Sequence, residues 1–80
     1  MLDLTTLEFK LLQTLVAHAR TVLTREQLLR EVWGYDYYGD ERVVDVHIRH
    51  LRQKIEPDPA DPKFIQTVRG VGYRFEDEPL

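Results

Sequence analysis

The chain has no cysteine among its 80 residues, and it holds only four glycines and four prolines. Without cysteine, neither a disulfide framework nor thiolate chemistry is available to it. No apolar run approaches the roughly 20 residues of a membrane-spanning helix, and the N-terminus lacks the basic-then-apolar pattern of a signal peptide. With 42% apolar and 31% charged residues, the sequence is typical of one small globular domain over residues 1–80, and a reducing cytoplasm is compatible with it.

Residue groupings typical of enzymes are absent as well. The sequence contains no Ser/His/Asp grouping near a glycine elbow and no glycine loop that cradles phosphates. His47 and His50 share one side of a predicted helix, but neither a cysteine nor a well-placed carboxylate joins them as a zinc ligand. We therefore expect a protein without catalytic residues, a bound metal or another cofactor.

Charge is distributed unevenly along the chain. The net charge of −3 gives little reason to expect a nucleic-acid partner. However, residues 1–41 carry four basic and seven acidic side chains, whereas residues 42–75 carry seven basic and four acidic ones. A phosphate backbone responds to charges within a Debye length of about 8–10 Å rather than to the total charge. The C-terminal half is therefore where we expect an anionic partner to bind.

Two capping boxes mark the starts of two helices. They are Thr5-Thr-Leu-Glu8 and Thr24-Arg-Glu-Gln27, in which the threonine caps the helix amides and the last side chain reaches back. Apolar residues then recur at helical spacing, which predicts one helix over about residues 6–19 and a second that stops at Gly34. Residues 22–23 between the helices are predicted to form a short extended link.

A third helix and a hairpin complete the predicted elements. Asp40 is placed to cap a helix over about residues 41–55, and the prolines at positions 57, 59 and 62 exclude helix from the stretch that follows. Residues 64–75 then predict a short hairpin with Arg69 and Gly70 at its tip. The predicted fold is mainly α with a small β hairpin.

The predicted third helix has two different faces. One side forms a core stripe of four aliphatic residues: Val44, Ile48, Leu51 and Ile55. The other side carries cationic and polar groups together with Val43 and Val46, although β-branched apolar residues gain nothing on a solvated helix face. In a major groove these valines can contact thymine methyl groups, and Arg49 can contact a guanine or a phosphate. Packing of the valines against this chain or a partner protein explains them equally well.

The hairpin tip favours the DNA interpretation. Arg69 lies beside Gly70, where the side chain can project, and a minor groove attracts an arginine strongly. Thr67 can donate its hydroxyl to a phosphate, although threonine is also a common strand residue. Gly70 and Gly72 are expected to serve the turn itself.

Four motifs occur in order along the chain. They are Thr-x-x-Glu-Phe-x-Leu-Leu from Thr5, Arg-Glu-Gln-Leu-Leu-x-x-Val-Trp-Gly from Arg25, Val-Asp-Val-His-Ile-x-x-Leu-Arg-x-Lys from Val44, and Thr-Val-Arg-Gly-Val-Gly-Tyr-Arg-Phe from Thr67. Together they resemble the winged-helix effector domain of OmpR/PhoB-type bacterial response regulators, over about residues 4–75. The resemblance implies a three-helix winged helix-turn-helix fold. It also implies sequence-specific binding of double-stranded DNA and transcription regulation within a two-component phosphorelay.

The resemblance also implies which residues bind DNA. It makes residues 41–55 the recognition helix in the major groove and residues 64–75 the wing. In the recognition helix, the residues implied to face bases or phosphates are Arg42, Val43, Val46, His47, Arg49, His50 and Arg52. In the wing, Thr67 and Arg69 would serve, with Arg69 in the minor groove, while Arg25 and Trp33 would contact the DNA backbone from the second helix.

Protein partners follow from the same resemblance. The loop between the second and third helices matches the segment that approaches RNA polymerase in relatives. Its residues suit a protein contact, although a loop packed by its own aromatic rings fits them as well: Tyr35, Asp36, Tyr37 and Tyr38. Relatives commonly bind direct repeats as head-to-tail dimers, with one repeat per helical turn of about 10 bp.

Two features depart from the family pattern. Some relatives carry arginine where this chain has His50, which would alter the preferred bases. Relatives also begin with a receiver domain, which is followed by a four-stranded antiparallel sheet. Met1-Leu-Asp-Leu4 can correspond only to the last residues of that sheet. The first helix is then expected to expose apolar surface. The alternative to DNA binding is a winged helix used as a protein–protein interaction module.

Overall fold

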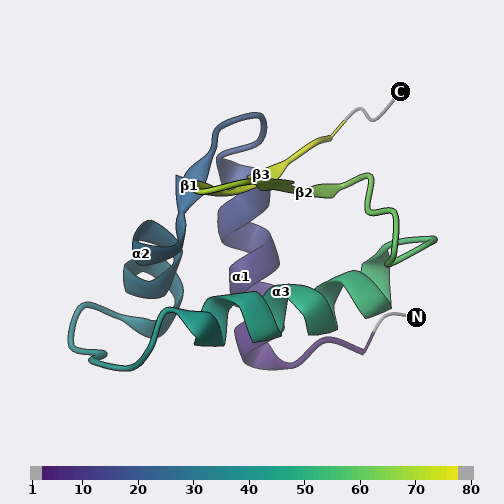
Figure 1. Cartoon of the computed structure of the whole chain (residues 1–80). Coiled ribbons are helices and arrows are strands. Elements are labelled where there is room, and N and C mark those ends of the chain that lie inside the picture. The colour runs from purple at the N-terminus through teal and green to yellow at the C-terminus, as the bar shows by residue number, and fades with distance from the viewer. Residues whose placement is uncertain (1–2, 78–80) are drawn as a thin grey trace.

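The computed structural model describes residues 3–77, which form three helices, the second of which continues as a π-helical segment, and one three-stranded antiparallel sheet. Figure 1 shows α1 in contact with α3 and with the sheet. The elements run in the order α1 (Thr6–Ala17), β1 (Leu23–Thr24), α2 (Arg25–Leu28), η1 (Leu29–Trp33), α3 (Arg42–Ile55), β2 (Ile65–Val68) and β3 (Gly72–Phe75). Within this range, no helix combines the length and the apolar character needed to cross a membrane.

The first capping box forms as predicted at the start of α1. Glu8 N–H donates to Thr5 Oγ1 at 3.1 Å, and Thr5 N–H donates to Glu8 Oε1 at 2.9 Å. The helix ends at Ala17, two residues before the predicted end. The chain turns there toward the sheet, and the Arg20 N–H donates to the Phe75 carbonyl of β3 at 2.8 Å.

The second helix is confirmed in position, but its turns widen halfway. The Thr24 and Gln27 side chains form the second capping box, which starts α2. After four residues the backbone continues as the π-helical segment η1. Gly34 N–H donates to both the Leu29 and Arg30 carbonyls, and its φ of +107° ends the helix, as the sequence predicts for a C-terminal glycine.

The ends of α3 are held by two acidic residues. The helix begins at Arg42, one residue later than predicted, so Glu41 rather than the predicted Asp40 occupies the N-cap position and its side chain caps no N–H. The Asp40 carboxylate still accepts the Arg42 N–H at 2.8 Å. At the other end, the buried Glu56 carboxylate accepts N–H groups from Lys63, Phe64 and Ile65. These bonds fold the proline-containing loop back and set the start of β2.

The hairpin is confirmed as β2 and β3, but the sheet has a third strand that the sequence analysis treated as a link. Leu23 pairs with Tyr73 and Thr24 pairs with Gly72, so β3 is central in the order β1-β3-β2. Gly72 therefore has a different role from the predicted one. A Cβ at this position would lie 2.0 Å from the Leu23 carbonyl oxygen, so glycine is needed for the close approach of two backbones, whereas Gly70 has φ +75° and serves the turn.

The core lies where α1, α3 and the sheet meet. The predicted stripe of α3 is confirmed, since Val44, Ile48 and Leu51 are fully buried and Ile55 packs against them. On the other side of α1, Phe9 is 57% exposed and Val16 is 47% exposed, as expected for an uncovered apolar surface. The predicted N-terminal sheet remnant falls partly on residues 1–2, outside the described residues, and residues 3–5 form no strand.

Candidate nucleic-acid interface

The outward face of α3 presents basic side chains around an exposed valine. Arg49 and His50 are exposed, and Val46 is 48% exposed, which confirms its predicted outward placement. Arg42 also faces solvent, and its guanidinium donates to Asp40 Oδ2 at 2.7 Å. Hydrogen bonds from Arg42 lower the pKa of Asp40, and those to Asp40 raise the pKa of Arg42, so both groups stay charged.

Val43 is not exposed on the outer face of α3, in contrast to the expectation that it faces DNA. Its side chain is half-buried and packs against the core cluster, as does Trp33. Val43 thus matches the alternative in which one of the two valines packs on its own chain. The helical wheel could not separate this position from Val46, because it shows direction and not which neighbouring segment covers the helix.

His47 is held between α3 and the end of the second helix. Its Nδ1 lies 2.9 Å from the Val43 carbonyl oxygen, which can only accept, so Nδ1 carries the proton. The Trp33 ring meets the imidazole edge-on at 5.2 Å between centroids, and the His50 ring lies 6.0 Å away. Within residues 3–77, no three His, Asp or Glu side chains are grouped closely enough to bind a metal ion, so His47 and His50 lack the further ligands that zinc requires.

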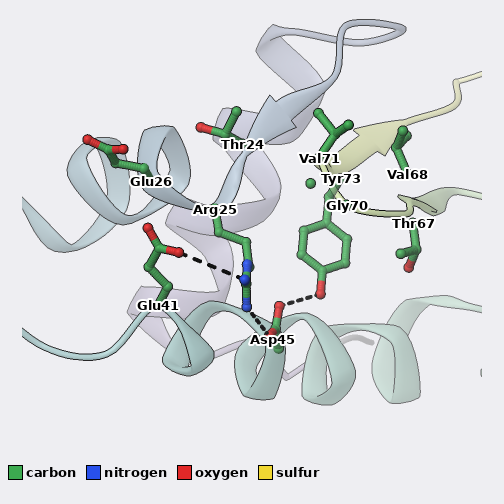
Figure 2. Close-up of a pocket in the computed structure, with 11 residues that line it drawn as sticks. Thr24, Arg25, Glu26, Glu41, Asp45, Thr67, Val68, Gly70, Val71 and Tyr73 are labelled. Carbon is green, nitrogen blue, oxygen red and sulfur yellow. Dashed lines mark hydrogen bonds and ion pairs between the residues drawn. The ribbon is translucent and has the colours of Figure 1, made fainter.

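A carboxylate on α3 joins the second helix to the sheet. Asp45 Oδ2 lies 2.9 Å from Arg25 Nη1, while the Tyr73 hydroxyl of β3 donates to Asp45 Oδ1 at 2.5 Å. Figure 2 shows Arg25 between Asp45 and Glu41, whose Oε1 lies 3.9 Å from Arg25 Nη2. Burial and the bond to Asp45 raise the pKa of Tyr73 to about 12, so its hydroxyl stays protonated and donates.

Arg52 makes a second connection between α3 and the wing, by which we mean β2, β3 and the turn between them. Its Nη2 donates to the Ile65 carbonyl at 2.8 Å and to Thr67 Oγ1 at 2.7 Å, and its guanidinium lies 5.6 Å from the Tyr73 ring centroid. Burial lowers the pKa of Arg52. Because Thr67 accepts this bond, its own hydroxyl proton can still donate outward.

The wing tip carries an exposed arginine and borders a polar hollow. Gly70 turns the chain, and the exposed Arg69 side chain precedes it. A hollow of about 420 Å³ separates this end of the wing from the helices. Figure 2 shows its lining side chains, which include Arg25, Glu41, Asp45, Thr67, Val71 and Tyr73.

The loop between η1 and α3 is open to solvent. Tyr38 is 95% exposed and Tyr35 is 75% exposed, and Asp36 is exposed beside them. Tyr37 is more covered, with its ring centroid 6.4 Å from that of Trp33. Of the three tyrosines, only Tyr37 therefore contributes to aromatic packing within this loop region of the described chain.

The predicted site residues divide into two groups by what they contact. Those that remain open at the surface are Val46, Arg49, His50 and Arg69, together with Arg42, which is exposed but also donates to Asp40. Those that are engaged within the chain are Arg25, Trp33, Val43, His47, Arg52 and Thr67. Asp45 and Tyr73 also belong to this interface, although the sequence did not predict them there. An acidic residue within an otherwise basic helix was the available signal for Asp45.

Comparison with known proteins identifies the family of the chain. The family described as "Transcriptional regulatory protein, C terminal" matches residues 1–75. The DNA-binding domain of Bacillus subtilis CssR is 40% identical, with a TM-score of 0.80, over 92% of this chain and 78% of that one. The DNA-binding domain of Klebsiella pneumoniae RstA, solved in complex with the RstA box, is 38% identical, with a TM-score of 0.85, over 96% of this chain and 76% of that one.

A longer relative shows the same similarity. Thermotoga maritima DrrB, described as an OmpR/PhoB homolog and response regulator, is 41% identical, with a TM-score of 0.86, over 94% of this chain. The chain spans about a third of DrrB, since 34% of that protein is covered.

Fold and comparisons together define a winged helix-turn-helix DNA-binding domain. The chain belongs to the family of transcriptional regulatory C-terminal domains, in its OmpR/PhoB response-regulator branch. The predicted fold class and family are therefore confirmed. The family is one of DNA-binding transcription regulators.

Proposed function

We propose that this chain binds duplex DNA sequence-specifically, with α3 in the major groove and the wing arginine in the adjacent minor groove. The observation that carries the proposal is that Val46 and Arg49 on α3 and Arg69 on the wing are all open at the surface. An apolar residue surrounded by cationic donors suits thymine methyl groups beside guanine and phosphate acceptors. The similarity to RstA, which was solved in complex with its own DNA box, supports the proposal.

Base readout is assigned to the open face of α3. Val46 contacts thymine methyl groups, Arg49 forks onto a guanine or a phosphate, and His50 contacts a base edge. With Arg42, these residues project beyond the half-buried Val43, whose contribution is to pack beneath them. A histidine at position 50 can use a single ring nitrogen toward a base, whereas an arginine there would offer two parallel donors.

Contacts to the DNA backbone are assigned to side chains that are already oriented within the chain. Thr67 accepts from Arg52 and can donate its hydroxyl to a phosphate. Arg25 uses Nη1 for Asp45, which leaves other guanidinium N–H groups for a phosphate. His47 and Trp33 reach the same strand from the junction of η1 and α3. Because these groups are held in place beforehand, less side-chain entropy is lost when they bind.

Regulation of transcription requires partners beyond DNA. We assign the exposed loop residues Tyr35, Asp36, Tyr37 and Tyr38 to a contact with RNA polymerase, since large aromatic rings open to solvent suit a protein interface. Head-to-tail pairing of two copies on direct repeats about 10 bp apart places successive copies on one side of the duplex. The role is one of binding without catalysis or a cofactor, as the output of a phosphorelay in the bacterial cytoplasm.

Selection of bound sequences from a random duplex pool tests the proposal. An enriched site whose affinity falls as salt rises is the expected result. Replacing Arg69 with Ala should then weaken binding to that site. A winged helix that serves only as a protein–protein module predicts no enriched duplex and no effect of Arg69→Ala. The exposure of both Arg49 and Arg69 disfavours that alternative.

A further inference from the structure

The wing is held to α3 at two points. At one point the Tyr73 hydroxyl donates to Asp45, and at the other Arg52 donates to Ile65 and Thr67. Asp45 and Arg52 are seven residues apart, so they lie on the same side of α3 and about 10 Å apart along its axis. Two separated attachments restrict both the distance and the angle between the helix and the hairpin.

On the hairpin, Tyr73 lies directly opposite Thr67, which Arg52 contacts, so the bond between Tyr73 and Asp45 differs from the Arg52 attachment in lying nearer the start of α3. Beyond it lies the polar hollow, which Thr67, Val68 and Val71 line from the wing and Arg25 and Asp45 line from the helices (Figure 2). The Tyr73 ring packs in the core and β1 pairs with β3 at Thr24 and Gly72, while the hydrogen bond from the Tyr73 hydroxyl to Asp45 is the polar link from this end of the wing to α3. Removal of that bond leaves the hydrogen bonds of Arg52 as the polar attachment of the wing to α3.

Asp45 places a negative charge between α3 and the wing. A bare carboxylate between the recognition helix and the wing would repel the phosphate strand that runs between the two grooves. Each of its oxygens is instead engaged by a donor from a different element, Arg25 on α2 and Tyr73 on β3. The carboxylate is thus a junction for α2, α3 and the sheet, and its charge is compensated within the chain.

We infer that Tyr73 is a positioning residue for DNA binding. Its hydrogen bond to Asp45 sets the spacing between α3 and the wing, so that Arg69 enters the minor groove when α3 occupies the major groove. The inference rests on the proposed DNA binding. It assigns to Asp45 and Tyr73 a function that does not require either residue to touch DNA.

A double-mutant cycle tests this role on the full chain and a duplex selected by the wild-type protein. Tyr73→Phe keeps the ring and removes the hydroxyl, and should lower affinity roughly 3- to 10-fold, the scale of one lost hydrogen bond. Combined with Arg69→Ala, it should cost little more than Arg69→Ala alone, because the wing contact is already lost. When Tyr73→Phe is combined with Arg49→Ala, the fold losses in affinity of the two variants should instead multiply, since Arg49 contacts DNA from α3 independently of the wing.

Two controls separate positioning from general stability. Thr14→Val removes a hydroxyl that donates to the Lys10 carbonyl within α1, and should leave DNA affinity unchanged. Thermal unfolding of Tyr73→Phe shows whether the variant remains folded at the assay temperature. If it does not, Asp45→Ala, which removes the acceptor of the Tyr73 hydroxyl, replaces it in the cycle, and the same non-additivity with Arg69→Ala is expected.

Each outcome decides one question. If the wild-type chain selects no duplex, the proposed function fails before the cycle begins. If the wild type binds and the losses from Tyr73→Phe and Arg69→Ala simply multiply, Tyr73 has no positioning role, although DNA binding stands. A Tyr73→Phe variant that is folded and binds with wild-type affinity overturns the inference in the same way.

Discussion

Lys54 on α3 contacts Glu8, the residue that completes the capping box of α1: Lys54 Nζ lies 2.6 Å from Glu8 Oε1. Glu8 is only 4% exposed, and the same oxygen accepts the Thr5 N–H. One carboxylate therefore completes the capping box of α1 and also pairs with a cation on α3. This makes α1 and α3 depend on a single ionised group.

We expect this pair to make stability depend on acid. The hydrogen bond from Lys54, followed by that from Thr5, lowers the pKa of Glu8 below the ordinary value of 4.5. A carboxyl whose native pKa is depressed adds stability above its unfolded pKa, and this stability is lost as pH falls from about 4.5 through the native pKa. Glu8→Gln should therefore lower the free energy of unfolding by about 1–2 kcal/mol at pH 7, and the difference should shrink toward pH 3, as measured by urea unfolding.

The matched variant Lys54→Met removes the cation and leaves the carboxylate buried. It should destabilise the protein at pH 7 by more than Glu8→Gln does, because an unpaired buried charge costs more than a lost pair. If the loss in the free energy of unfolding for each variant is the same at pH 7 as at pH 3, the role of the pair is contradicted.

Gly72 should be the glycine least tolerant of alanine. The added Cβ would lie 2.0 Å from the Leu23 carbonyl oxygen and 2.8 Å from the Thr24 Cα, so β1 would have to move from β3. We expect a loss of about 2–3 kcal/mol in the free energy of unfolding for Gly72→Ala, the upper part of the range for overpacking. Gly70→Ala is the comparison, since a Cβ there meets nothing within 4 Å and only the φ of +75° is unfavourable. Thermal unfolding that ranks Gly70→Ala as the more damaging change would refute this account.

Glu56 should be required for the connection between α3 and β2. Its two carboxylate oxygens accept four hydrogen bonds from the N–H groups of Lys63, Phe64 and Ile65. Glu56→Gln leaves one acceptor oxygen in a buried position, so buried N–H groups lose their partner at a cost of about 1–3 kcal/mol. The exposed Glu31→Gln provides the control, with a change below about 0.5 kcal/mol expected for a surface site. Similar midpoints in urea for both variants would show that the loop does not depend on this carboxylate.

Local signals in the sequence predicted most of the fold. Both capping boxes involve groups three residues apart, and Gly34 acts on its own backbone, so neither depends on distant parts of the chain. The strand β1 depends on pairing with β3, nearly 50 residues later, and two residues carry too little pattern to reveal it. The close approach at Gly72 follows from that same pairing and could not be predicted without it.

The candidate site was predicted less completely than the fold, for a related reason. A helical wheel gives the direction of each side chain, which was enough to place Val46 outward and Val44 inward. It does not give the partners that tertiary structure brings near, such as Tyr73 for Asp45 or Ile65 for Arg52. Charged residues assigned to DNA from the family resemblance, such as Arg25 and Arg52, are therefore the ones whose roles the structure extends to contacts within the chain.

Val46 and Val44 provide the sharpest separation of binding from folding, because they differ by two positions on one helix. Val46 is 48% exposed and Val44 is fully buried. Val46→Asp places a negative charge toward the phosphate backbone and the bases, so it should abolish binding to the selected duplex. Its free energy of unfolding should stay within about 0.5 kcal/mol of wild type, as for other surface substitutions. Val44→Asp buries an unpaired carboxylate and should unfold the domain. Circular dichroism and DNA titration of the two variants distinguish these effects, and loss of folded structure in Val46→Asp would contradict the outward position on which the proposed major-groove contact depends.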